Sequence, residues 1–225
     1  ASQQLSGRPV VANGFGTYPD PQGFEEVEAD YLGDEARLVA TMERRDLGFV
    51  IGGGHVLAVH QAAPGRGSMV EGDPPVLNLR WMKATPLSQL LIAGSGLPSV
   101  EVPHLERLMP VAASEAVARG ISFPLPLVWA FELVPGARIT GRAGPGALVT
   151  GEIELREWGR PHRYRAWTRA DDGGNFTLRV AVPTRFGVQA IQTGPAWRIT
   201  AGEAPSVEVE VPEAAVRGGL EVPLP

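Results

Sequence analysis

The sequence predicts an α+β protein in which a small α/β central-core layer precedes an all-β domain of the sandwich or barrel type. Helix-like spacing of apolar residues is found in the first half of the chain, whereas the second half repeats short segments that alternate between apolar and polar residues. The 28 glycines and 21 prolines follow no repeat period, which indicates many turns and short strands. We place the boundary at the proline-rich segment 123–126, which gives domains of residues 1–126 and 127–225.

The first domain is expected to contain two adjacent helices and a strand. Residues 21–32 and 35–46 show the three- and four-residue apolar spacing of helices, and Asp34 is suited to cap the second one. A strand is expected from residue 49, which completes a small α/β layer. Further short helical segments are expected at residues 86–93, 103–108 and 114–119.

The second domain contains the clearest strand pattern of the chain. In residues 147–156, Val149, Ile153 and Leu155 occupy one face, and mostly polar residues occupy the other, as in a half-buried strand. Residues 163–170 and 175–182 flank Asp-Asp-Gly-Gly, which predicts an antiparallel hairpin. The expected strands are 127–134, 137–142, 147–156, 162–170, 175–182, 187–192 and 206–211, with short additions at 197–200 and 220–222.

Three glycines at 52–54 follow the first strand and allow two interpretations. A phosphate-binding loop would need a helix N-terminus and usually a lysine after the glycines, and neither follows. The pattern is more typical of a tight connection to a second strand at residues 55–60, because glycine adopts positive φ without steric cost.

Composition excludes some classes of function. The net charge of −5 and the scattered arginines argue against a nucleic-acid partner, which usually selects for a basic patch. The absence of cysteine excludes disulfides and cysteine-ligated zinc. The sequence contains no apolar run near the roughly 20 residues that a membrane-spanning helix needs.

Isolated motifs do not assemble into a catalytic or metal site. None of the four histidines has partners at metal-ligand spacing, so we interpret each as an ordinary surface or turn histidine. Asn175-Phe176-Thr177 matches the sequence of an N-glycosylation acceptor, but three-residue matches are common by chance, and a turn asparagine at the start of a strand is the favoured explanation.

Several segments, taken in order, resemble a known family. RPVVANGFGTY at residues 8–18, LERLMPVAASE at 105–115, WAFELVPGARITGRAGPGALV at 129–149, DDGGNFTLRVAVPT at 171–184 and VEVEVPEAAVRGG at 207–219 are the main blocks. In this order they resemble the extracytoplasmic C-terminal globular region of the archaeal-type oligosaccharyltransferase catalytic subunit, a GT-C membrane glycosyltransferase.

This resemblance implies a parent enzyme that transfers a lipid-linked oligosaccharide to an asparagine of an acceptor polypeptide. The implied partners are therefore the parent's transmembrane domain, the acceptor polypeptide and the lipid-linked oligosaccharide, and the implied location is the extracytoplasmic face of the membrane. A divalent metal, Mg or Mn, is implied for the full-length enzyme, but its ligands and the catalytic carboxylates would lie outside this chain. The fragment alone is expected to be inactive.

The resemblance also indicates an acceptor-facing segment and a departure from the family pattern. Asn13, Phe15, Gly54 and His55 are expected on the acceptor side, although turn formation and core packing are the alternative explanation for all four. GGGHVLAVHQ at residues 52–61 lacks the Asp and Lys of the family's second acceptor motif. Either the acceptor pocket is altered, or the parent uses another acceptor.

A second hypothesis is a non-enzymatic module that binds glycan or cell-wall polymer. Sugars stack on exposed aromatic rings, and the candidate platforms are Trp158, Trp167 and Trp197. A tryptophan in a strand more often belongs to the core, because it buries a large apolar area.

Overall fold

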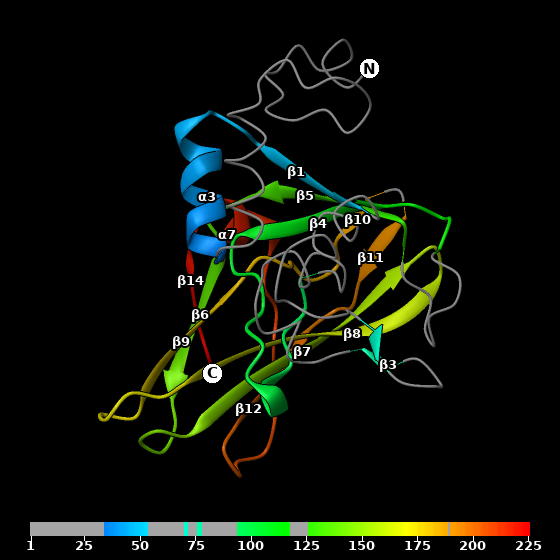
Figure 1. Ribbon diagram of the computed structural model, residues 1–225. Helices are drawn as coiled ribbons and strands as arrows, with labels where there is room; N and C mark the ends of the chain where they lie inside the picture. The colour runs from blue at the N-terminus through cyan, green and yellow to red at the C-terminus, as the bar shows by residue number, and fades with distance from the viewer. Residues whose placement is uncertain (1–33, 54–69, 72–75, 78–93, 118–125, 189) are drawn as a thin grey trace.

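The computed structural model describes residues 34–53, 70–71, 76–77, 94–117, 126–188 and 190–225. These residues form a mainly β structure with two α-helices, so the predicted α+β class is confirmed (Figure 1). A short two-stranded sheet, β2 (Val70–Glu71) and β3 (Val76–Leu77), stands apart from the three larger sheets. The predicted elements at residues 21–32, 55–60 and 86–93 lie outside the described residues. None of the described helices is long and apolar enough to cross a membrane.

Helix α3 (Glu35–Arg44) begins where the sequence predicts. The carboxylate of Asp34 accepts a hydrogen bond from the backbone N–H of Arg37 at 2.8 Å, which satisfies a donor that the first helical turn leaves unpaired. Leu38, Val39 and Met42 form the buried face, as their spacing predicts. Strand β1 (Phe49–Gly53) follows directly.

The first sheet has the strand order β1–β5–β4 and is antiparallel throughout. Strand β5 (Val128–Leu133) is central, and β4 (Leu108–Ala113) is its second neighbour. Trp129 and Phe131 point from β5 into the core, where their rings stack with centroids 6.0 Å apart. The strand predicted at 127–134 is confirmed, and its partners are β1 and β4, which precede it in the chain.

Two local predictions before β5 are corrected. Residues 103–108 are not helical, because they form a loop that leads into β4 at Leu108, and residues 114–117 of the second predicted segment are not helical either. The loop is held by the Glu35 carboxylate, which accepts the backbone N–H groups of Glu106 and Arg107, each at 2.8 Å.

The largest sheet is built on the two long strands β7 (Leu148–Glu157) and β8 (Arg160–Arg169), which pair along their whole length. The other edge of β7 is shared by β12 (Trp197–Ala201) and β11 (Ile191–Thr193). Strand β13 (Val207–Val209) pairs with β12, and β10 (Gly187–Val188) pairs with β11. The segment predicted as one strand at 187–192 is therefore a short hairpin of β10 and β11. Val149, Ile153 and Leu155 are buried, which confirms the predicted apolar face.

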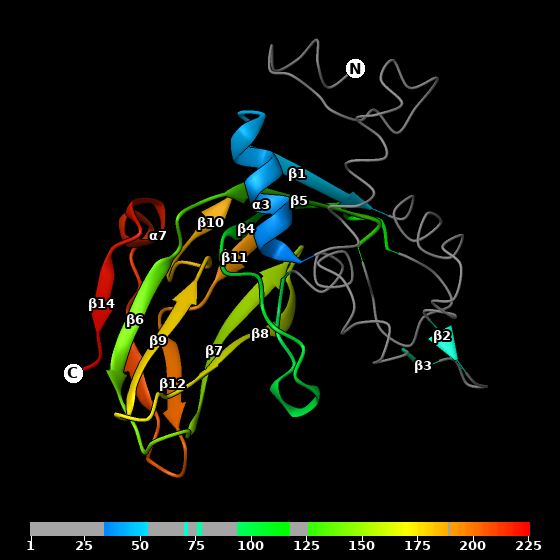
Figure 2. The ribbon, with the colours of Figure 1, turned by 60° about the vertical axis from the view of Figure 1, so that its left-hand side comes forward.

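The third sheet covers the apolar face of the large one (Figure 2). Its order is β14–β6–β9, with β6 (Ala137–Arg142) in the centre, β9 (Asn175–Val180) antiparallel and β14 (Glu221–Pro223) parallel to it. The sheets pack closely at Gly151, where a Cβ would lie 3.0 Å from the side chain of Leu178 in β9. The predicted sandwich-like architecture is therefore confirmed.

The predicted hairpin around Asp-Asp-Gly-Gly is wrong. The turn forms, with the Asp171 N–H donating to the Asn175 carbonyl at 2.8 Å, but β8 pairs with β7 and β9 pairs with β6. Tyr164 on β8 and Leu178 on β9 are both fully buried, so both strands contribute apolar side chains to the core from different sheets. The actual hairpin of β8 is the one with β7.

Helix α7 (Glu213–Gly218) connects the third sheet to the first. Arg217 makes a two-pronged ion pair with Glu132 of β5, with N···O distances of 2.5 and 3.1 Å. Hydrogen bonding to Glu132 and then Glu213 raises the pKa of Arg217. Buried side chains of α3 and of all three larger sheets belong to one continuous hydrophobic cluster.

The hydrogen bonds that the Glu35 carboxylate accepts from Glu106 and Arg107 give a first testable expectation. Burial raises the pKa of Glu35 to about 7, although the two backbone N–H donors oppose this rise. A carboxyl group with a raised pKa stabilises the fold below its unfolded pKa, and this stability is lost as the pH rises towards 7. Glu35→Gln loses one acceptor and should lower the free energy of unfolding by about 1–3 kcal/mol at pH 5.

Chemical denaturation at several pH values measures this effect. The difference in unfolding free energy between wild type and Glu35→Gln should become smaller from pH 5 to pH 7. Glu203→Gln, a matched change at an exposed turn residue, should change the unfolding free energy little at any pH. A difference that does not change with pH would contradict the raised pKa.

Candidate functional site

The predicted acceptor-side residues Asn13, Phe15, Gly54 and His55 lie outside the described residues. The described residue that directly precedes Gly54 and His55 is Gly53, the last residue of β1, which pairs with Val128 of β5. We call this edge of the first sheet, where β1 and β4 end and β5 begins, the Gly53 end. It lies on the right in Figure 1. The described residues around it therefore form the candidate site.

The tip of the β7–β8 hairpin lies at the Gly53 end (Figure 1). The indole Nε1–H of Trp158 donates to the carbonyl of Ala113, the last residue of β4, at 2.9 Å. The Arg160 guanidinium donates to the Glu115 carbonyl at 3.4 Å. These contacts hold the turn between β7 and β8 at the Gly53 end of the first sheet.

Trp158 has a backbone conformation that other residue types adopt more readily. It and Gly159 form a two-residue turn with φ of 50° and 76°, the pattern of a type I′ hairpin turn. Asparagine or glycine normally occupies the first position, because a Cβ there costs about 1–2 kcal/mol. The residue is 48% exposed, so burial does not explain the choice of tryptophan. Backbone outliers of this kind are typical of functional positions.

Four polar side chains lie at the same end, and we call Trp129, Glu157, Arg160 and His162 the hairpin-end cluster. Glu157 is only 6% exposed, and its carboxylate lies 3.1 Å from His162 Nδ1. One atom of each residue is buried without a hydrogen-bond partner: Trp129 Nε1, Glu157 Oε2, Arg160 Nη2 and His162 Nε2. Buried polar atoms of this kind are uncommon in folded proteins and call for an explanation.

The hairpin-end cluster offers both hydrogen-bond donors and acceptors. Trp129 and Arg160 can only donate, Glu157 accepts when ionised, and a neutral histidine does either according to its tautomer. The carboxylate of Glu157 also orients the ring of His162, as carboxylates do for histidines in many functional sites. The set therefore holds both donors and acceptors at the Gly53 end, and the four unpaired atoms are buried in the structure.

The strand register contains the signal that would have revealed this cluster. The buried face of β7 runs through Val149, Gly151, Ile153 and Leu155, and the next residue in this alternation is Glu157. A carboxylate that continues an apolar face is unusual, and the prediction of a strand ending at residue 156 missed it. Its pairing with residues of β8 required the structure.

The described residues do not provide a metal centre. They contain no group of three or more His, Cys, Asp or Glu side chains able to hold an ion. In the hairpin-end cluster, the cationic Arg160 is also unsuited to a cation site. We therefore derive no catalytic step through a metal from this chain.

His104 corrects the interpretation of all histidines as surface or turn residues. It is 4% exposed and bridges two strands: Nε2 donates to the Arg179 carbonyl of β9 at 2.7 Å, and Nδ1 accepts the Trp167 N–H of β8 at 3.3 Å. Burial lowers the pKa of His104. This neutral, fully engaged ring has a structural role rather than a catalytic one.

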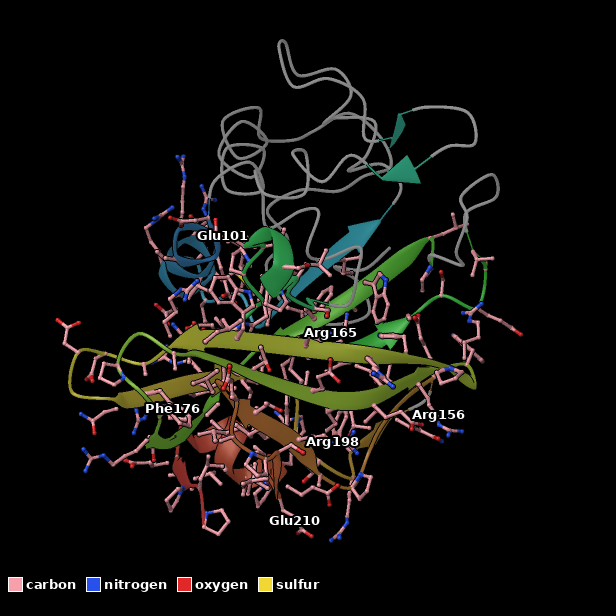
Figure 3. All side chains as sticks on the ribbon, turned by 90° about the horizontal axis from the view of Figure 1, so that it is seen from below. Glu101, Arg156, Arg165, Phe176, Arg198 and Glu210 are labelled. Carbon is pink, nitrogen blue, oxygen red and sulfur yellow. The ribbon has the colours of Figure 1, made fainter. Side chains whose placement is uncertain are left out.

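The polar face of the large sheet carries an open cleft of about 430 Å³. Its charged lining residues pair across neighbouring strands, as in Glu152 with Arg163 at 3.7 Å and Glu208 with Arg198 at 3.9 Å. Figure 3 labels Arg156, Arg165 and Arg198 of this sheet. Exposed cross-strand ion pairs of this kind satisfy one another and explain the cleft without a ligand.

The proposed aromatic platforms differ in exposure. Trp197 is fully buried against Tyr164, and its Nε1–H donates to the Val182 carbonyl at 2.9 Å, so it is a core residue. Trp167 is partly buried, and its Nε1–H donates to the Val102 carbonyl at 2.8 Å. Trp158 is the exposed member of the three.

Comparison with known proteins gives a family match for the β-rich part of the chain. Residues 136–222 match the family described as the archaeal glycosylation protein B long peripheral domain. The match begins directly after β5 and covers β6 to β14. No curated protein shows a significant sequence match to the chain.

Solved structures share the fold over most of the chain. One is the archaeal oligosaccharyltransferase AglB from Archaeoglobus fulgidus in complex with an inhibitory peptide and a dolichol-phosphate, with TM-score 0.67 and 13% identity over 88% of this chain and 32% of that one. A complex of the Archaeoglobus fulgidus oligosaccharyltransferase with Zn and sulfate has a TM-score of 0.65 and 15% identity, over 95% of this chain and 37% of that one. The same enzyme tethered by a disulfide bond to an acceptor peptide with the NVT sequon has a TM-score of 0.68 and 13% identity, over 88% of this chain and 33% of that one.

The chain thus spans about a third of the length of the solved oligosaccharyltransferases that it matches. At 13–15% identity these structures show a common fold, and the family match adds sequence support for residues 136–222. The resemblance to the C-terminal globular region of the archaeal-type oligosaccharyltransferase is therefore confirmed, by a peripheral-domain match and by a fold shared over most of the chain.

Proposed function

We propose that this chain is the extracytoplasmic domain of a membrane oligosaccharyltransferase-like glycosyltransferase of the GT-C type, which transfers a lipid-linked oligosaccharide to protein asparagine. The observation that carries the proposal is the peripheral-domain match at residues 136–222 within a fold shared over most of the chain. The parent's transmembrane domain, the acceptor polypeptide and the lipid-linked oligosaccharide are the proposed partners. Mg or Mn is the proposed metal of the full-length enzyme, with its ligands elsewhere in the parent.

The division into domains of residues 1–126 and 127–225 remains a proposal. The family match supports a boundary near this point, because it starts at residue 136. Strand β5 lies between residues 126 and 136 and pairs with β1 and β4.

We also propose that the Gly53 end faces the acceptor, together with Asn13, Phe15, Gly54 and His55. The support is that β1 leads directly into Gly54, and that the exposed Trp158 contacts the end of β4 at the same edge of this three-stranded sheet, next to the hairpin-end cluster. In this arrangement the chain binds and orients the acceptor polypeptide, whereas the catalytic groups come from the rest of the parent.

Deletion of residues 55–61 from the full-length enzyme tests the acceptor-side proposal. We expect transfer to an acceptor peptide to be abolished, because the segment that continues β1 would be removed. Membrane insertion and expression of the deletion variant should be checked by detergent extraction and immunoblotting. Unchanged transfer would overturn the proposal.

A point substitution at the hairpin tip separates function from folding. Trp158→Asn creates the Asn-Gly turn that type I′ hairpins favour, so the hairpin should retain its stability while the indole is lost. If Trp158 contacts the acceptor or glycan, transfer should fall about tenfold, the loss that corresponds to about 1.4 kcal/mol.

The matched control is Leu220→Asn, which removes an exposed apolar side chain next to α7. It should leave transfer unchanged. Equal rates for wild type and Trp158→Asn, with equal unfolding free energies, would exclude the indole from the site.

The exposed Trp158 also keeps a glycan-binding module as a second candidate. Titration of the isolated fragment with oligosaccharides, followed by tryptophan fluorescence, distinguishes the two functions. Saturable quenching that Trp158→Asn removes would favour a binding module, whereas we expect no saturable response from the fragment.

A further inference from the structure

We propose that Asn175 is an acceptor for an asparagine-linked glycan, so that the domain is itself modified. Asn175-Phe176-Thr177 is the only Asn-x-Ser/Thr sequence in the chain, whose other asparagines precede Gly-Phe and Leu-Arg. The proposal rests on the proposed function, which places the chain on the face of the membrane where a lipid-linked glycan donor is available.

The folded domain accommodates a glycan on Asn175, because the side chain lies on the solvent side of β9. Successive residues of β9 point to opposite faces, so Asn175 and Thr177 are both exposed while Phe176 is 4% exposed. The Phe176 ring packs against Gly141 of β6, where a Cβ would be only 2.7 Å from the Cζ atom of Phe176. The acceptor amide and the hydroxyl two residues on therefore share the solvent side, and the middle residue anchors the segment.

The alternative explanation, an asparagine needed for the turn, does not account for this side chain. The turn is closed by backbone groups of Asn175: its N–H donates to Asp171 Oδ1 at 2.8 Å, and its carbonyl accepts the Asp171 N–H at 2.8 Å. The side-chain Nδ2 has only a long 3.5 Å contact with Asp171 Oδ1. Any residue with a backbone N–H can close this turn, so the amide is available for another role.

The chemistry balances with the donor named in the proposed function. The Nδ2 atom of Asn175 forms a bond to the anomeric carbon of the donor sugar, and the bond between that carbon and the phosphate oxygen breaks. The lipid phosphate or diphosphate leaves with the electron pair, and one proton leaves Nδ2. Since the backbone of Asn175 closes the turn in the folded domain, we expect transfer before β9 pairs with β6.

Mass spectrometry of the protein from its source cells tests the proposal. Trypsin cleavage after Arg169 and Arg179 releases a peptide of residues 170–179 that contains Asn175. We expect this peptide to carry a glycan in wild type, to lose it in Thr177→Ala and Asn175→Gln, and to keep it in Thr177→Ser. The fragment produced in a host without this pathway supplies the unmodified reference mass.

A reporter polypeptide that contains Asn-Phe-Thr, expressed in the same cells, separates the two proposals. A modified reporter with an unmodified 170–179 peptide would overturn the assignment of Asn175 and leave the proposed function intact. If neither is modified, both proposals fail. Occupancy that depends on Thr177 supports Asn175 as the acceptor.

Discussion

Replacement of His104 by alanine is expected to lower the free energy of unfolding by about 3–4 kcal/mol. The change leaves the Trp167 N–H and the Arg179 carbonyl without their partner and opens a cavity at a fully packed position. The effect is large because the ring joins the outer edges of two sheets. Beside it, the Gly96 N–H donates to the Arg165 carbonyl at 2.7 Å, and Ser95 Oγ accepts the Arg165 N–H at 3.0 Å.

A second substitution separates packing from hydrogen bonding. His104→Phe fills much of the same volume but restores neither hydrogen bond, so it should remain destabilised by about 1–3 kcal/mol. Equal stability of His104→Phe and wild type in urea titrations would show that the two hydrogen bonds contribute nothing.

The pH dependence of this variant follows from the direction of the pKa shift. Burial lowers the pKa of His104, so the unfolded chain binds a proton at a higher pH than the native protein does. The stability that His104 contributes is thus fully present above its unfolded pKa and is lost as the pH falls below about 6.5. Wild type should lose stability on acidification in this window, and His104→Phe should lack this component.

Gly136→Ala is expected to have the second large effect, about 3 kcal/mol or more of destabilisation. Gly136 joins β5 to β6 at φ 77°, and a Cβ there would lie 2.4 Å from the backbone carbonyl oxygen of Glu106. A backbone oxygen cannot rotate away as a side chain can, so the loop held by Glu35 would have to move. Two costs therefore combine, a left-handed backbone and a steric overlap.

Two other glycines act as matched controls. Gly146 has φ 68°, and no atom lies within 4 Å of the position that a Cβ would take, so Gly146→Ala should show the backbone cost alone, about 1 kcal/mol. Gly144 also has open space and no left-handed φ, so Gly144→Ala should be within about 0.5 kcal/mol of wild type. Thermal or urea unfolding that ranks Gly136→Ala with Gly146→Ala would contradict the close contact with Glu106.

The sequence was informative wherever local chemistry decides the structure. The Asp34 cap, the buried face of α3 and the alternation in β7 depend on neighbours within a few residues, and all three are confirmed. Strand partners depend on the whole chain instead. The residues near Asp171 do not indicate that β9 pairs with β6 instead of with β8. The apolar residues of β5 likewise do not reveal its pairing with β1 and β4.

The candidate site was predicted only in part, for the same reason. The resemblance pointed to Gly54 and His55, and the structure describes the strand that leads to them. The position of the hairpin tip at the candidate site depends on the contact between Trp158 and Ala113. These residues are 45 apart in the sequence, and no local pattern encodes such a contact. His104 likewise has partners 63 and 75 residues away.

The size and location of the native protein test the central proposal most directly. An antibody raised against this chain would be used on fractionated source cells. We expect a band far above the 23.9 kDa of this chain, in the membrane fraction and released only by detergent. A soluble band near 23.9 kDa would contradict a membrane-bound parent enzyme and would leave the glycan-binding module as the better explanation.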